Sequence, residues 1–172
     1  MMTQTMTDTF NEQINRELYS AYLYTSMEHW FMKKGLKGFA NWFKVQAGEE
    51  LNHARKIMDY ILLVRKIMDY INERGGRIRL KAVSMPDSDW QNILSVFENS
   101  LSHEEYVTSE INRISELAEE EKDKASEIFL QWFIQEQIEE ESSINSIIDA
   151  LRMIGNSVVA TFDLDRELLN RS

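Results

Sequence analysis

The sequence of 172 residues contains no cysteine, a single proline and no long hydrophobic run. Without cysteine there are no disulfides, thiolate metal sites or iron–sulfur clusters, and the composition fits a reducing cytoplasm, where we expect the protein to reside. The longest aliphatic run, Ile61 to Val64, is far shorter than the roughly 20 residues that span a bilayer, so no membrane partner is expected. The net charge of -10 argues against nucleic acid as a partner and favours cations.

Helix-forming residues dominate the sequence, and apolar residues recur at alternating steps of three and four along four long stretches. This spacing places them on one face of a helix, the face that normally enters a core. We expect one all-α domain, residues 1–172, built as a four-helix bundle with a long crossover between its second and third helices and a short fifth helix. The predicted helices cover residues 7–34, 38–73, 88–120, 123–154 and 158–169.

Turn and capping residues predict the helix ends. Gly35 is expected to end the first helix, and Asp123 and Ser157 are expected to cap the fourth and fifth helices. Ser88 with Gln91 three residues later has the form of a capping box that opens the third helix.

The crossover between the second and third helices is predicted to be extended. Ile78, Leu80 and Ala82 alternate there with basic residues, which indicates a segment with one covered side. A connection of this length makes the second and third helices parallel.

Each of the four apolar stripes is interrupted near its middle by groups that bind metals. These groups are Glu17 in the first stripe, Glu50 and His53 in the second, Glu104 in the third, and Gln137 and Glu140 in the fourth. Burying an unpartnered carboxylate is costly, and a shared cation removes that cost. The alternative is a buried hydrogen-bond network, for example Glu17 with His53 and Gln137. The metal is favoured because four acids around one base would repel one another without a cation.

The predicted second helix contains an exact internal repeat. Its residues 55–60, Arg-Lys-Ile-Met-Asp-Tyr, recur at 65–70. A spacing of ten matches no repeat architecture, so we interpret it as a local duplication or an engineered insertion. Ten residues add about 15 Å of helix and about 1000° of turn, roughly 80° short of whole turns. The stripe can continue through Val64, Ile67 and Ile71 in a longer helix; the alternative is that the extra residues loop out.

Several segments together resemble the non-haem ferritins of bacteria and archaea, and the resemblance covers nearly the whole chain. The matching segments are residues 14–24, 35–42, 49–54, 73–77, 103–104, 120–123, 129–133 and 136–141. The resemblance implies an iron-storage subunit with ferroxidase activity, which oxidises Fe(II) with O2 or peroxide and stores ferric mineral inside a homo-oligomeric shell of twenty-four subunits. Carboxylates with one imidazole also suit iron in both oxidation states.

The resemblance also implies roles for single residues in a diiron centre. Glu17, Glu50 and His53 match the first iron site, and Glu50 would bridge to a second iron. The second iron would be held by Glu104 and Glu140.

Further roles follow from the same resemblance. Gln137 would position oxygen or water beside the second iron, and Tyr24 matches a tyrosine that donates an electron during oxygen reduction. Glu49, Glu136 and Glu139, with Glu140 shared, resemble a third iron site. For these three the alternative is a solvated acidic face.

Related classes of protein fit the sequence less well. A bacterioferritin would carry Glu-x-x-His where this chain has Gln137 and Glu140, and methionine where it has Asn52, so no haem is expected. Rubrerythrin-like proteins add a cysteine-based iron site, and miniferritins place their ligands at a subunit interface. The exact repeat leaves open an engineered, ferritin-derived assembly scaffold with an altered oligomeric architecture. His29 and His103 are expected at the surface or at an interface.

Overall fold

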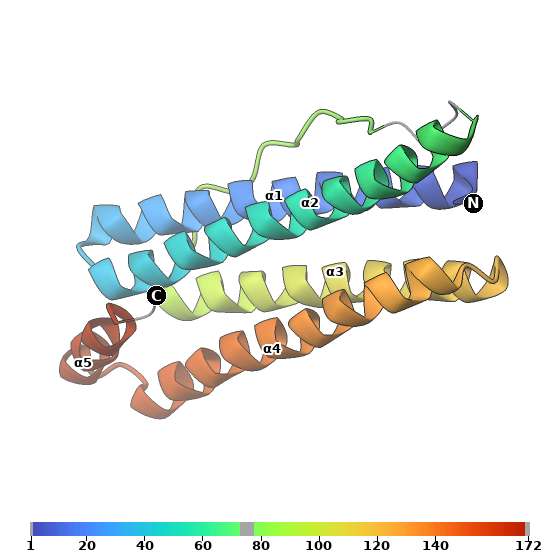
Figure 1. The fold of residues 1–172 in the computed structure, drawn as a ribbon. Helices are drawn as coiled ribbons and strands as arrows, with labels where there is room; N and C mark the ends of the chain where they lie inside the picture. The colour runs from blue at the N-terminus through green and yellow to red at the C-terminus, as the bar shows by residue number, and fades with distance from the viewer. Residues whose placement is uncertain (1, 73–77, 171–172) are drawn as a thin grey trace.

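The computed structural model describes residues 2–72 and 78–170, without the side chains of residues 62–72. Within these ranges the chain forms a four-helix bundle with a short helix at one end, which confirms the predicted fold class (Figure 1). The helices are α1 (Gln4–Lys34), α2 (Lys37–Asn72), α3 (Ile93–Glu120), α4 (Lys124–Ile154) and α5 (Val158–Leu168). None of the described helices is long and apolar enough to cross a membrane.

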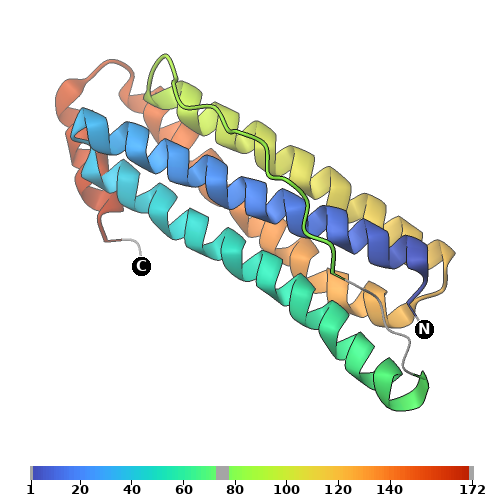
Figure 2. The same cartoon turned by 90° about the horizontal axis from the view of Figure 1, so that it is seen from above.

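The bundle consists of two antiparallel hairpins, α1 with α2 and α3 with α4 (Figure 1). The described part of the crossover, residues 78–92, runs back along the outside of α1 to the start of α3 (Figure 2). As a result α2 and α3 run parallel, as the long connection predicted. The last helix, α5, packs across the end of the bundle where α2 begins.

Most helix ends follow the predicted capping residues. Gly35 ends α1 in the left-handed region at a φ of 76°, a conformation that glycine adopts without strain. The side chains of Asp123 and Ser157 accept hydrogen bonds from the backbone amides of Ser126 and Ala160, and so cap α4 and α5.

The predicted start of the third helix at residue 88 is wrong, because α3 begins at Ile93. Its capping box is formed one turn later than expected. The backbone amide of Ser95 donates to Asn92 Oδ1 at 2.9 Å, and the backbone amide of Asn92 donates to Ser95 Oγ at 3.1 Å. Ser88 and Gln91 therefore belong to the crossover. The pair Ser88 and Gln91 and the pair Asn92 and Ser95 both have the spacing of a capping box, but only Asn92 and Ser95 form one.

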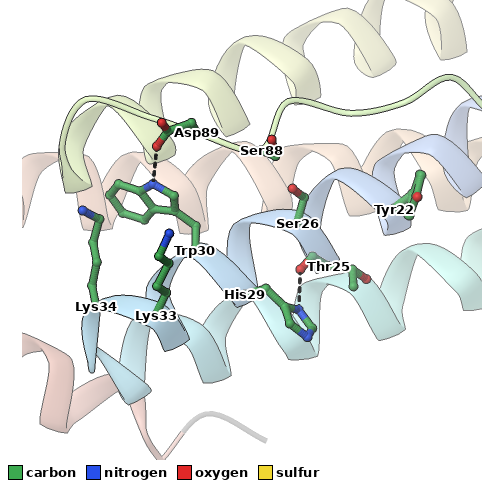
Figure 3. A pocket seen from close by; sticks show the side chains of 9 residues that line it. All are labelled: Tyr22, Thr25, Ser26, His29, Trp30, Lys33, Lys34, Ser88 and Asp89. Carbon is green, nitrogen blue, oxygen red and sulfur yellow. Dashed lines mark hydrogen bonds between the residues drawn. The ribbon is translucent and has the colours of Figure 1, made fainter.

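Hydrogen bonds to α1 hold the end of the crossover. The indole of Trp30 donates to Asp89 Oδ1 at 3.2 Å at the edge of a surface pocket (Figure 3), and Ser26 Oγ donates to the carbonyl of Asp87 at 2.7 Å. The expected covered side is wrong at Leu80, which is 64% exposed. Ala82 is exposed as well, whereas Ile78 packs against the apolar core, so only the start of the segment has the expected covered side. Hydrogen bonds to Asn11 and Ser26 of α1 hold the segment.

The repeat lies inside one continuous helix. Both copies, residues 55–60 and 65–70, fall within α2, so the alternative of a local loop is wrong. The last turns of α2 form its green end in Figure 1. The continuation of the apolar stripe through Val64, Ile67 and Ile71 stays a prediction, because these side chains lie outside the described ones.

Two apolar clusters fill the bundle, one toward each end. The first is built around Tyr24, Phe43, Phe97 and Ile144, and the second around Phe10, Ile14, Ile57, Val107 and Phe133. On each of the four long helices, the polar residues predicted to bind metal lie between the residues of the two clusters. The apolar packing at both ends therefore fixes the axial position and the rotation of each helix, and so the position of its polar residues in this layer.

Candidate metal centre

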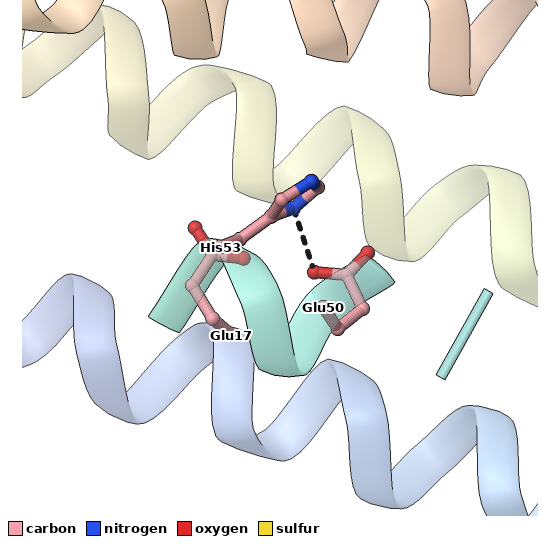
Figure 4. Close-up of side chains that lie close together, drawn as sticks. All are labelled: Glu17, Glu50 and His53. Carbon is pink, nitrogen blue, oxygen red and sulfur yellow. Dashed lines mark ion pairs between the residues drawn. The ribbon is translucent and has the colours of Figure 1, made fainter. Parts of the chain in front are cut away.

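Glu17 from α1 and Glu50 and His53 from α2 converge in the polar layer (Figure 4). One ligand atom from each of the three lies within 4.8 Å of the others, and the three side chains are 1%, 1% and 4% exposed. Glu50 and His53 reach the same point because residues three apart share a helix face. His53 Nδ1 faces Glu50 Oε2 at 3.3 Å.

The two remaining predicted carboxylates complete the layer from the other hairpin. Glu104 on α3 and Glu140 on α4 are 1% and 7% exposed. Both lie close enough to Glu50 for their charges to raise its pKa, and so does Glu17. The structure thus brings the predicted set of four carboxylates and one imidazole into one buried layer.

Two further predicted residues hold Glu104. The phenol of Tyr24, which is fully buried, donates to Glu104 Oε1, and Gln137 Nε2 donates to Glu104 Oε2 at 2.9 Å. Burial, followed by the charges of Glu104 and Glu50, raises the pKa of Tyr24 well above 10.0, so this phenol keeps its proton. Tyr24 is therefore a neutral donor in direct contact with the layer.

The pKa values of the layer show that burial disfavours the charged forms of its side chains. Burial, with the neighbouring carboxylates, raises the pKa of Glu50 well above 4.5, and burial raises that of Glu104 to about 7. Burial also lowers the pKa of His53, so its imidazole is neutral at pH 7 and offers a lone pair. In the metal-free state Glu50 and Glu104 are therefore the carboxylates that hold protons, which a cation would displace.

Unpartnered oxygens provide the direct test of whether a metal fits. Glu17 Oε2 and Glu50 Oε1 are buried and have no hydrogen-bond partner among the described residues. Glu17 and Glu50 lie within hydrogen-bonding reach of each other, so the two carboxylates need either a proton or a cation between them. The proposed network fails at Gln137, which donates to Glu104 and not to Glu17. The donor set fits a hard cation bound between the helices.

A surface pocket next to His53 brings together two of the three acids expected at a third site. Glu49 and Glu136 line it, together with His53 and Trp132. Glu136 Oε2 lies 3.8 Å from His53 Nε2, and the Trp132 ring meets the His53 ring edge-on at 5.4 Å. The third acid, Glu139, is not among the described residues that line this pocket; it is exposed and accepts from Gln135 at 3.5 Å.

The sequence did not single out two glutamines that contact the layer. Gln13 Nε2 donates to Glu17 Oε1 at 2.8 Å, and Gln46 Nε2 donates to Glu140 Oε2; both glutamines are fully buried. Their spacing of four residues from Glu17 and Glu50 was a usable signal, because residues four apart share a face.

Of the two histidines expected at the surface, one is buried in part. His29 is exposed, with Nδ1 2.9 Å from the carbonyl of Thr25. His103 instead packs against Tyr19 at 5.4 Å between ring centroids, and its Nε2 lies 2.8 Å from Ser20 Oγ. Burial lowers the pKa of His103 to about 4.

A family model of the ferritin-like domain matches residues 7–65 and 63–154, most of the chain. The two matched stretches meet at residues 63–65, inside the duplicated part of α2. With the bundle and its buried acidic layer, this match shows that the chain belongs to the ferritin family.

Individual relatives match over their full length. The bacterial non-heme ferritin of Staphylococcus aureus strain USA300 is 38% identical over 168 residues, 98% of this chain and 95% of the relative. That of Bacteroides fragilis is 34% identical over 171 residues, 99% and 100% of the two chains. A crystal structure of an open-pore ferritin from the archaeon Archaeoglobus fulgidus superimposes with a TM-score of 0.92 at 45% identity, covering 100% of both chains.

Proposed function

We propose that this protein is an iron-storage ferritin subunit that oxidises Fe(II) to Fe(III) in the buried layer. The observation that carries the proposal is the convergence of Glu17, Glu50 and His53, with two carboxylate oxygens left without a partner. The chain's membership of the ferritin family supports iron as the metal. Haem has no role in the proposal.

The residues divide between two iron positions. Glu17, Glu50 and His53 bind the first Fe(II), and Glu50 bridges to a second that Glu104 and Glu140 hold. Neutral His53 offers a lone pair, and the carboxylates release their protons as the metal binds. Two Fe(II) ions give two electrons to one O2, which takes up two protons and becomes hydrogen peroxide. With peroxide as the oxidant, two electrons and two protons yield two water molecules.

The surrounding residues keep this chemistry in place. Tyr24 and Gln137 orient Glu104 through their hydrogen bonds. Tyr24 would supply an electron, together with its phenolic proton, where only one Fe(II) is oxidised, so that one Fe(II) and Tyr24 together give the two electrons that reduce O2 to hydrogen peroxide. The anionic ligands favour Fe(III) over Fe(II), because their charge stabilises the higher oxidation state. Glu49, Glu136 and Glu139 are proposed as a third iron site; the pocket beside His53 supports the first two of them.

We place the stored mineral inside a homo-oligomeric shell, which holds twenty-four subunits in this family. Exposed apolar side chains on α5 support an oligomer, because large apolar groups exposed together mark contact surfaces. They include Val158, Val159 and Phe162, which are 68%, 74% and 54% exposed. Because the repeat lengthens α2, the number and arrangement of subunits in this protein are predicted separately.

The test compares His53→Ala with the parent protein and with His29→Ala. His53→Ala removes a ligand but little packing, so Fe(II) oxidation followed by stopped-flow absorbance should lose its fast phase while circular dichroism stays unchanged. His29 is exposed, and its variant should oxidise Fe(II) as the parent does. Oxidation by His53→Ala at the parental rate would refute the assignment. A parent protein that assembles but neither binds nor oxidises Fe(II) would instead support the assembly scaffold, which the intact ligand set does not favour.

A further inference from the structure

Three carboxylates of the buried layer each accept a hydrogen bond from a glutamine amide. Besides Gln137, which donates to Glu104, Gln13 donates to Glu17 and Gln46 donates to Glu140. The three donors come from α4, α1 and α2, and all are at most 3% exposed. Buried amides on three different helices with the same chemical role indicate a built arrangement and not a chance contact.

The hydrogen bonds of Gln13 fix which way its amide points. Its Oε1 accepts from Arg16 at 3.2 Å, so its Nε2 must face Glu17, where it donates at 2.8 Å. Arg16 is itself held by an ion pair with Glu110. A chain of contacts from the surface thus orients Glu17, whose second oxygen, Oε2, is the one without a partner.

Gln46 holds Glu140 from the opposite end of the layer. It lies one turn before Glu50 on α2, on the side of the first apolar cluster, and it is 0% exposed. Its Nε2 donates to Glu140 Oε2, and its Oε1 has no hydrogen-bond partner among the described residues. Burying an amide with one unsatisfied atom costs free energy. A role of Gln46 in orienting Glu140 explains why such an amide is buried here.

An amide suits this role better than a charged donor. Lysine or arginine would hold a carboxylate more strongly, but its positive charge would cancel the negative charge that attracts the metal. A neutral amide orients the carboxylate and leaves its charge intact. Partners of metal ligands commonly change metal affinity by about 10- to 100-fold when they are removed.

We propose that Gln13 and Gln46 are positioning residues of the metal centre, each acting on one half of it. Gln13 acts through Glu17 on the position bound by Glu17, Glu50 and His53. Gln46 acts through Glu140 on the position bound by Glu104 and Glu140. The inference rests on the proposed function only in requiring that the layer binds two metal ions; it does not require that iron is oxidised there.

The experiment titrates Zn(II), which is redox-inert, into the metal-free full-length protein by isothermal titration calorimetry. The parent should show two tight sites per chain. Gln13→Leu and Gln46→Leu keep similar volume and remove the donor, so each should weaken one site about 10-fold or more and spare the other. In a His53→Ala background, Gln46→Leu should weaken the remaining site and Gln13→Leu should not. Gln131→Leu, at an exposed glutamine of α4, is the control and should bind as the parent does.

Thermal unfolding of the same metal-free variants separates positioning from structure. Positioning residues should change Zn(II) affinity at one site without a matching loss in the unfolding midpoint. Unchanged Zn(II) affinity, or an equal loss at both sites together with a lower midpoint, would overturn the proposal. A parent that binds no Zn(II) would overturn both the proposal and the metal centre. A parent that binds two Zn(II) ions but does not oxidise Fe(II) would overturn only the ferroxidase activity.

Discussion

At the scale of single residues, burying the carboxylates of the polar layer destabilises the folded protein, and we expect a bound cation to remove part of this cost. Glu50 and Glu104 are buried beside other carboxylates, and their raised pKa values record that the ionised forms are disfavoured. The two unpartnered oxygens of Glu17 and Glu50 add to the cost. The metal-free protein is therefore less stable than its packing alone would make it, and its stability must depend on pH and on cations.

In the metal-free protein, the stabilising contribution of Glu104 should be lost as the pH rises from about 6.5 to about 8. The folded state holds a proton on Glu104 up to a pKa of about 7, whereas the unfolded chain releases it near 4.5, so stability falls as the pH rises through 7. Glu104 alone accounts for about 1 kcal/mol over this range, and Glu50 adds to it. His53 and His103, whose pKa values are lowered, act in the opposite direction, because near pH 6.5 the unfolded chain still binds protons at these histidines that the folded state does not. The contribution of Glu104 is therefore read from the difference between the parent and Glu104→Gln. Urea unfolding in the presence of a chelator measures the change.

Two controls test the cause of that pH dependence. Glu104→Gln cannot ionise at this position, so its unfolding midpoint should vary less with pH than that of the parent. Zn(II) should remove the dependence in the parent, because it occupies the site only when the carboxylates are ionised. A parent whose unfolding midpoint varies with pH from 6.5 to 8 in the same way as that of Glu104→Gln would contradict the proposed origin of the pKa shifts.

The third iron site is tested by removing its acids one at a time. Glu49→Ala, Glu136→Ala and Glu139→Ala should keep the first fast oxidation step and change the ratio of iron oxidised to oxygen consumed. An oxygen electrode measures this ratio, and Glu105→Ala, at an exposed position of α3, is the matched control. If the three variants consume oxygen as the parent does, these acids form a solvated face.

The convergence of the proposed ligand residues in one buried layer was predictable from the sequence, but their hydrogen-bond partners were not. Glu50 and His53 lie three apart within an apolar stripe, and this pattern requires a buried polar pair whatever the details of packing. Gln46 lies in the same stripe, yet which carboxylate it meets depends on the rotation of α4 relative to α2. That rotation is set by side-chain packing across the bundle, and no periodicity along one helix encodes it.

At the scale of elements, α5 docks on the start of α2 through a buried carboxylate, beside the apolar packing of Leu164 and Leu168 and a hydrogen bond from Asn41 to the carbonyl of Leu168. The backbone amides of Gly38 and Phe39 donate to Asp165 Oδ1 at 2.8 and 2.9 Å. These amides belong to the first turn of α2, which has no partners of its own within the helix. A carboxylate there also complements the helix dipole. Asp165, 7% exposed, thus joins the end of the chain to the bundle.

Gly38→Ala should detach α5 from the bundle. A methyl group at Gly38 would overlap the backbone carbonyl of Asp165, so the contact cannot form without moving one helix. We expect a loss of at least about 1 kcal/mol, comparable to losing a helix cap, and faster cleavage by trypsin after Arg166. Limited proteolysis followed by mass spectrometry measures the release.

Gly48→Ala is the matched control for this substitution. Gly48 lies within α2, and a methyl group there meets no atom within 4 Å. Because alanine favours a helix over glycine by about 1 kcal/mol, this variant should be as stable as the parent or more stable. If Gly38→Ala and Gly48→Ala resist trypsin equally, the contact between Gly38 and Asp165 does not hold α5.

Helix boundaries were predictable only where one capping signal stood alone. Gly35 and Asp123 had no competitor nearby, and both ends are correct. At the start of α3 two capping boxes followed one another, Ser88 with Gln91 and Asn92 with Ser95. The sequence could not choose between them, because the choice is made by the hydrogen bond from Trp30 to Asp89, which joins distant parts of the chain.

At the scale of the whole molecule, the repeat lengthens α2 without a matching change in its partners. The structure shows α2 continuing to Asn72, whereas its hairpin partner α1 begins at Gln4. Ten residues correspond to about 15 Å of helix, enough to change how the end of one bundle meets its neighbours. The added segment Ile61 to Val64 is aliphatic on all sides of one helical turn, and we predict that part of it finds a new partner or lies exposed.

We therefore expect the parent and a variant lacking residues 61–70 to form particles of different size. The shortened variant should assemble into a shell of twenty-four subunits, and the parent into an assembly of another mass. Analytical ultracentrifugation and electron microscopy measure both, and Fe(II) oxidation should be retained in the variant because no proposed ligand is removed. Identical twenty-four-subunit shells from both proteins would show that the longer α2 leaves the subunit contacts unchanged.

The place of the repeat in the chain also bears on how such proteins diversify. An insertion of ten residues rotates everything that follows it on the same helix by about 80° relative to whole turns, which would misdirect any ligand there. On α2, however, the proposed ligands all precede residue 54, and the next one, Glu104, lies beyond the crossover. The length of the second half of α2 can thus change without moving any of the proposed ligands, so a change there bears on subunit contacts and leaves the proposed metal centre in place.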